Sequence, residues 1–158
     1  MLLFDRRASL FAAFALVGCG FAPMHGTNSK SLIVRNKVLV QAPKNRVEFE
    51  LVQNLEVQLG QATEKLYDLS YTLAVDEQVI VVSAAQEINR FSLVGSLKFS
   101  LVDADGAVVL SKTAKSFTGY SATGTTVATE RSKRDAYDRL MVILAEKVSN
   151  YLWAVEGA

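Results

Sequence analysis

The residue best suited to covalent chemistry in this 158-residue sequence is its single cysteine, Cys19. It ends the motif Leu16-Val17-Gly18-Cys19, which follows a short basic start (1–7) and an apolar run (8–17). Such a run is too short to cross a bilayer as a helix, which takes about 20 residues, but it fits the hydrophobic region of an export signal. The motif matches a bacterial lipobox, so we expect residues 1–18 to be removed and Cys19 to carry lipid.

Lipid on Cys19 predicts where the protein is held. Each buried methylene contributes about 0.8 kcal/mol, and one acyl chain alone anchors only marginally. The three chains usual for a bacterial lipoprotein therefore make a durable anchor. The next residue is Gly20 rather than the aspartate that retains enteric lipoproteins at the inner membrane, which favours an outer-membrane location facing the periplasm.

Residues for enzymatic chemistry are few. The only histidine is His25, close behind the cysteine, so neither a His/Cys/carboxylate metal set nor a Ser-His-Asp arrangement can be assembled. Two carboxylate pairs, Asp76/Glu77 and Asp103/Asp105, are interpreted as solvated turn residues. No Gly-Lys-Ser/Thr phosphate loop is present. The sequence therefore predicts no enzyme, no metal and no cofactor.

A basic cluster is one candidate for ligand chemistry: Arg131, Lys133 and Arg134, just after a Gly/Ser/Thr-rich loop at 121–126. The signal segment holds two of the 17 basic and one of the 16 acidic residues, so the remaining chain has 15 of each. Because it carries no net charge, any anion binding must be local. Two interpretations stay open, a solvated helix face or phosphate recognition, in which arginine supplies bidentate geometry and lysine a point charge.

The elements that would position this cluster begin after a tether at 19–31. A strand is predicted at 32–41, and a helix at 46–59. Asn45 and Glu48 form a capping box before that helix, and Gly60 suits its end.

Three strands and a second helix follow. A long strand at 66–83 is expected to bend near its acidic pair, and strict alternation predicts a strand at 91–101. An Asp-Gly turn leads into a returning strand at 108–120. The last helix is predicted at 129–154.

These elements predict the fold class. Their order is β-α-β-β-β-α, which suits an α+β two-layer sandwich with two helices packed on a four-stranded, mostly antiparallel sheet. The domain would span 32–158 after the cleaved signal and the tether. Leu97 and Leu144, each on the apolar side of a periodic segment, are expected to be buried between the layers.

The sequence resembles the family of the lipopolysaccharide (LPS)-assembly lipoprotein LptE, in its alphaproteobacterial form. The opening Cys19-Gly20-Phe21-Ala22-Pro23-Met24-His25-Gly26 is similar to the opening of that family. Similar patterns recur, in the same order, within the segments 46–59, 71–75, 89–103, 115–121 and 130–148.

The resemblance implies a non-enzymatic binding and assembly subunit. Family members plug the outer-membrane β-barrel LptD, assist its assembly and bind LPS. Their basic LPS contacts lie at the turn between the second and third strands and before the last helix. Here the first region, 81–85, offers no basic residue until Arg90, whereas the second offers Arg131, Lys133 and Arg134. Arg90 is expected to join them if the strand end and the helix start lie at the same edge of the sandwich. The alternative is another envelope lipoprotein of similar topology, such as an auxiliary subunit of a lipid transporter.

Overall fold

The computed structural model describes residues 34–82, 88–122 and 124–155. Its elements follow in the order β1 (Val38–Val40), α2 (Arg46–Leu59), β2 (Tyr67–Val82), β3 (Ile88–Asp103), β4 (Val108–Ser121) and α3 (Thr126–Val155). The predicted β-α-β-β-β-α order is confirmed, and the helix expected at 46–59 has those bounds.

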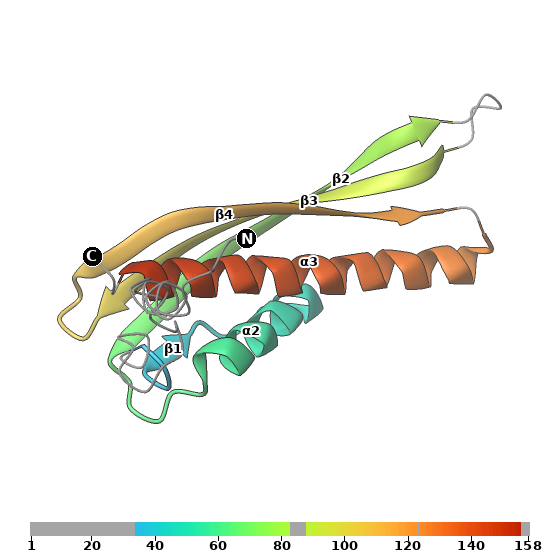
Figure 1. The fold of residues 1–158 in the computed structure, drawn as a ribbon. Coiled ribbons are helices and arrows are strands. Elements are labelled where there is room, and N and C mark those ends of the chain that lie inside the picture. The colour runs from blue at the N-terminus through green and yellow to red at the C-terminus, as the bar shows by residue number, and fades with distance from the viewer. Residues whose placement is uncertain (1–33, 83–87, 123, 156–158) are drawn as a thin grey trace, which may run out of the picture.

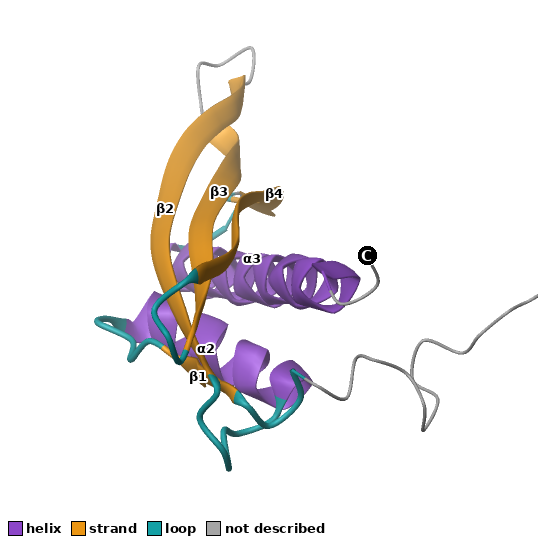
Figure 2. Cartoon of the chain, turned by 90° about the vertical axis from the view of Figure 1, so that its left-hand side faces the viewer, coloured by secondary structure: helices purple, strands orange, loops and turns teal. Residues whose placement is uncertain are grey.

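The four strands form one sheet in the order β1-β2-β3-β4. β1 runs parallel to β2, and the other neighbours are antiparallel. Both helices lie on one face of this sheet, which confirms the two-layer α+β class (Figure 1). α3 runs along the length of the sheet, whereas α2 covers only the half that contains β1. The other face carries no helix among the described residues (Figure 2).

Alternation along β3 sets which face is buried. Its buried residues are Leu93, Gly95, Leu97, Phe99 and Leu101, while the intervening Lys98 is exposed. The predicted register is therefore confirmed. Leu97 and Leu144 are both fully buried, as expected for residues at the interface between the sheet and α3.

The two helices contribute matching apolar stripes to this core. α2 buries Leu51, Val52, Leu55 and Leu59. The buried leucines and valine of α3 are Leu140, Leu144, Val148 and Leu152. The capping box is present, since the Asn45 side chain accepts a hydrogen bond from the Glu48 backbone N–H at 2.9 Å. Gly60 follows α2 with a φ of 80°, a conformation that favours glycine.

Gly95 lets α3 approach β3 closely. A Cβ at this position would lie 3.0 Å from methyl groups of both Leu140 and Leu144. A larger residue here would require the leucine side chains of α3 to shift.

Two details of the sequence prediction are wrong. The first strand covers only Val38–Val40, because residues 34–37 form a turn with Asn36 at a φ of 62°. That turn docks on α2, since the Asn36 N–H donates to the Leu59 carbonyl at 2.8 Å. Asp76 and Glu77 also lie within β2 and not in a turn, and the irregularity of this strand falls between Val79 and Val82.

The export signal, Cys19 and His25 lie outside the described residues, so the predictions for the anchor and tether remain predictions. Within residues 34–82, 88–122 and 124–155, no helix is long and apolar enough to span a bilayer.

Candidate functional site

The predicted basic residues come together at one end of the fold. Arg90, near the start of β3, lies opposite Ser121 at the end of β4, and α3 begins five residues later at Thr126. We call this region, residues 77–82, 88–93, 117–122 and 124–137, the hairpin end. Figure 1 shows that α2 does not reach it.

Arg131 and Arg134 line one open hollow of about 440 Å³ on the first turns of α3. Thr125 caps this helix, because its hydroxyl accepts a hydrogen bond from the Ala128 N–H at 3.3 Å. Both arginines are exposed and have no ion-pair partner among the described residues. Val127, 80% exposed, adds apolar surface to the same hollow. The arrangement offers two guanidinium groups beside an apolar side chain, with the carboxylate of Glu130 also in the lining.

Lys133 is directed elsewhere. Its ammonium lies 2.7 Å from one carboxylate oxygen of Glu77 on β2. The other oxygen of that carboxylate accepts a hydrogen bond from the Tyr120 hydroxyl on β4. Glu77 therefore joins β2, β4 and α3 at a point that α2 does not cover.

The contacts among Glu77, Lys133 and Tyr120 shift the pKa of each group. Burial raises the pKa of Glu77, but hydrogen bonds from Lys133 and Tyr120 outweigh it and keep that pKa below its usual value. The hydrogen bond to Glu77 raises the pKa of Lys133. Burial, and then the bond to Glu77, raise the pKa of Tyr120. All three groups thus keep their usual neutral-pH ionisation, with Lys133 engaged by a carboxylate.

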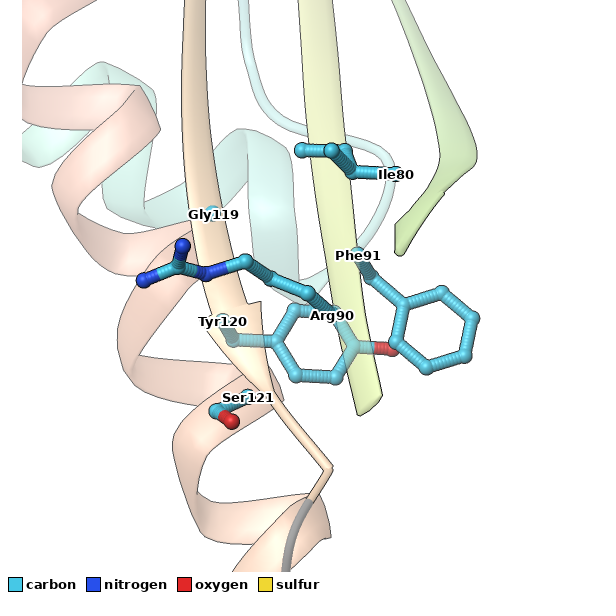
Figure 3. A pocket seen from close by; sticks show the side chains of 6 residues that line it. All are labelled: Ile80, Arg90, Phe91, Gly119, Tyr120 and Ser121. Atoms are coloured by element: carbon cyan, nitrogen blue, oxygen red, sulfur yellow. The ribbon is translucent and has the colours of Figure 1, made fainter. Parts of the chain in front are cut away.

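Arg90 borders a second hollow, of about 330 Å³, lined mainly by apolar groups. The rings of Phe91 and Tyr120 stack within it, with centroids 5.0 Å apart and planes 9° from parallel. Figure 3 shows Arg90 directed across β4 toward Gly119 while the two rings lie next to each other. Arg90 is exposed and, like the arginines of α3, has no described ion-pair partner.

The structure thus divides the predicted set. Arg131 and Arg134 share a hollow, and Arg90 lies at the same end of the molecule. Arg90 alternates with the inward-facing Phe91, so its register assigns it to the open face of the sheet, whereas Lys133 reaches the helix-covered face. No group of three or more His, Cys, Asp or Glu residues that could hold a metal occurs in the described part of the chain.

Glu77 is the participant that the sequence prediction missed. It was interpreted as a turn residue, but it follows Tyr71, Leu73 and Val75 at intervals of two along β2. Strand alternation alone would have placed it on the helix-covered face. No sequence signal paired it with Lys133, because their contact depends on how α3 crosses the sheet.

A family model described as "LptE: Lipopolysaccharide-assembly" matches residues 35–152 of this chain. No match was found among curated protein sequences.

Solved structures share the fold. A putative lipoprotein from Caulobacter crescentus superimposes with a TM-score of 0.67 and 23% identity, covering 84% of this chain and 99% of that one. Rare lipoprotein B from Shewanella oneidensis gives a TM-score of 0.60 and 9% identity over 76% of this chain and 94% of that one. An uncharacterized lipoprotein B from Nitrosomonas europaea gives a TM-score of 0.59 and 13% identity, covering 77% of this chain and 84% of that one. At these identities the likeness concerns the fold.

Proposed function

Because this chain belongs to the LptE lipopolysaccharide-assembly family, we propose that it is a non-enzymatic outer-membrane lipoprotein that binds LPS and partners an LptD-like β-barrel. Lipid on Cys19 would hold it at the membrane, facing the periplasm. Its task would be to plug and help assemble that barrel and to assist delivery of LPS to the outer leaflet.

The observation that carries the LPS part is that guanidinium groups without an ion-pair partner among the described residues lie beside apolar side chains at the hairpin end. Arg131 and Arg134 adjoin Val127, and Arg90 adjoins the Phe91–Tyr120 stack. LPS combines phosphate groups with acyl chains, so it requires cations and apolar surface side by side. Arginine suits the phosphates because its planar fork binds two oxygens at once.

Within this proposal the basic residues have different roles. Arg90, Arg131 and Arg134 would contact LPS phosphates directly. Lys133 already binds Glu77, so its primary role would be to hold β2 against α3 and keep the other cations in position. A direct contact of Lys133 with LPS would require that ion pair to open.

Purified variants and fluorescently labelled LPS test this division. Charge-assisted hydrogen bonds contribute about 1.5–3 kcal/mol each, so Arg131→Ala/Arg134→Ala should weaken LPS binding by at least about tenfold. The defect should shrink at high salt, where exposed charges are screened. Lys133→Ala should have a smaller effect on binding.

The matched control is Lys44→Ala/Arg46→Ala, which removes two exposed charges near the start of α2. It should leave binding unchanged. Equal LPS binding by wild type and the double arginine variant at low ionic strength would assign Arg131 and Arg134 to a solvated helix face.

Co-purification tests the barrel partner. The chain should co-purify with a large outer-membrane β-barrel from solubilised membranes, and the double arginine variant should do so equally well. Recovery with an inner-membrane lipid transporter instead would favour the role of a transporter auxiliary subunit.

The anchor has its own test. Cys19→Ala should abolish incorporation of a palmitate analogue in cells, because no other cysteine is present. Equal labelling of wild type and variant would exclude lipidation at this residue.

A further inference from the structure

The two outer edges of the sheet differ, and the edge formed by β2 is largely unpaired. β2 has 16 residues, but β1 pairs only with Tyr67, Asp68 and Leu69. Beyond β1, the side chain of Gln41 accepts a hydrogen bond from the Tyr71 N–H at 3.4 Å, in place of a backbone partner. Figure 2 shows no described element beside the rest of this strand on that side.

The backbone groups along this edge follow a regular pattern. The Leu69 carbonyl accepts from the Gln41 N–H at 2.9 Å, so the odd-numbered residues direct their N–H and C=O groups away from β3. Leu73, Val75 and Glu77 continue that pattern until the irregularity that begins after Val79. The free stretch, 72–79, is about 27 Å long at about 3.4 Å per residue.

At the opposite edge, two backbone carbonyls of β4 receive hydrogen bonds from side chains of α3. Arg139 on α3 donates to the Gly119 carbonyl at 3.2 Å, and Lys147 donates to the Lys115 carbonyl at 2.5 Å. Unpaired edges invite pairing with other chains, and proteins usually protect them. In the described part of this chain only the β4 edge receives such side-chain donors from a helix.

We propose that the free edge of β2, residues 72–79, accepts an extended basic segment of another polypeptide as an added strand. A strand is the occupant that the row of backbone N–H and C=O groups specifies. It would also cover the sides of Leu73 and Val75, which are only partly buried, and of Val79, which is 49% exposed.

The carboxylates of β2 favour a basic segment as the added strand. Among the carboxylates of β2, Asp68 pairs with Lys65 at 3.1 Å and Glu77 pairs with Lys133 at 2.7 Å. Asp76 has no cation among the described residues, and accepts a hydrogen bond only from Gln78, at 2.9 Å. A lysine or arginine on the open-face side of the added strand would lie across from Asp76, and opposite charges across strands stabilise pairing.

The same residues disfavour a second copy of this chain. Antiparallel pairing of two β2 edges centred on Asp76 or Glu77 places two carboxylates opposite each other, whereas pairing centred on Val75 places Asp76 opposite Ala74, where it gains no cation. Like charges directly opposite each other destabilise a strand pair. A partner with lysine or arginine at that position avoids this repulsion.

A defined peptide tests the inference on the full chain. The probe is the eight-residue acetyl-Lys-Val-Thr-Val-Lys-Val-Thr-Val-amide, measured by fluorescence anisotropy and by amide exchange. It should bind and slow exchange of the Leu73, Val75 and Glu77 amides by at least about tenfold. A glutamate-for-lysine peptide should bind about fivefold more weakly. A peptide N-methylated at every second residue, which lacks the edge-facing N–H groups, should not bind.

Variants locate the site. Asp76→Asn should remove the preference for the lysine peptide, whereas Asp68→Asn, where β1 covers the edge, should preserve it. Val75→Pro should abolish binding, and Thr113→Pro on the β4 edge should not. Absence of binding, or equal binding of the N-methylated peptide, would overturn the proposal. Equal affinity for the glutamate and lysine peptides would show that the partner segment need not be basic. Dimers of the chain whose β2 amides are protected from exchange would show that the edge instead pairs with a second copy of this chain.

Discussion

The half of the sheet covered by α2 and the hairpin end are held together by different interactions. Under α2, the leucines of both helices and of β3 form a continuous core, with Leu51, Leu55 and Leu97 all at most 1% exposed. At the hairpin end, Phe91 is only partly buried, Ile80 is 57% exposed, and one carboxylate, Glu77, links three elements.

This difference separates stability from binding. Buried apolar area is the main source of folding free energy, so the covered half should determine global stability. The hairpin end leaves cations and apolar groups exposed, which contributes little to folding but makes them available to ligands. Substitutions in the two regions should therefore have different consequences.

The largest effect is expected from truncating the core. Leu144→Ala and Leu97→Ala should each lower the free energy of unfolding by about 2–5 kcal/mol, because each leaves a cavity between sheet and helix. Urea denaturation measures this loss. The control Val57→Ala removes a side chain that is 75% exposed and should change stability by less than about 0.5 kcal/mol. Similar losses for Leu144→Ala and Val57→Ala would show that the interface between the layers is not the core.

An intermediate effect is expected where α3 crosses the sheet. Gly95→Val would force a branched side chain against Leu140 and Leu144, which already lie 3.0 Å from the position of a Cβ. Overpacking of this kind costs about 1–3 kcal/mol, measurable by the same denaturation. The neighbouring Ser96→Val faces the open side and should be nearly neutral. A Gly95→Val protein more stable than wild type would mean that α3 can move away from the sheet without a loss in the free energy of unfolding.

The smallest effect is expected at the hairpin end. Glu77→Gln removes the ion pair with Lys133, whose side chains are 27% and 34% exposed, so water screens it and the loss should be about 0.5–1 kcal/mol at about pH 7. The control Asp76→Asn, on an exposed carboxylate without a described cation, should be nearly neutral.

The loss from Glu77→Gln should depend on pH. The pKa of Glu77 in the folded protein is lower than the usual pKa of a glutamate, so its contribution is complete above the usual value and is lost as pH falls through the lowered pKa. The stability difference between wild type and Glu77→Gln should therefore shrink in acid. A difference that is constant between about pH 7 and about pH 3 would contradict the assigned role of the carboxylate.

Much of the architecture could be read from local patterns. The 3.6-residue stripe and capping box predicted α2 with its bounds, and the alternation of β3 predicted which of its faces is buried. These predictions succeeded because helix and strand periods place side chains on faces whatever the neighbours are. The basic residues of the candidate site could likewise be named from the sequence, since charge density is a local property.

What those residues contact depends on how distant segments pack against each other. The sequence grouped Lys133 with Arg131 and Arg134, but the packing of α3 along β4 and β3 lets Lys133 reach Glu77 on β2, 56 positions earlier in the chain. The same long-range arrangement buries Tyr120 to 7% exposure while leaving Phe117 73% exposed three residues away. It also leaves the β2 edge beyond Leu69 largely unpaired, because β1 ends at Val40 and the chain then continues into α2 at Arg46. Local sequence patterns specify on which face of a helix or strand a side chain lies. The residues that this side chain contacts depend on which distant segments the folded chain brings together.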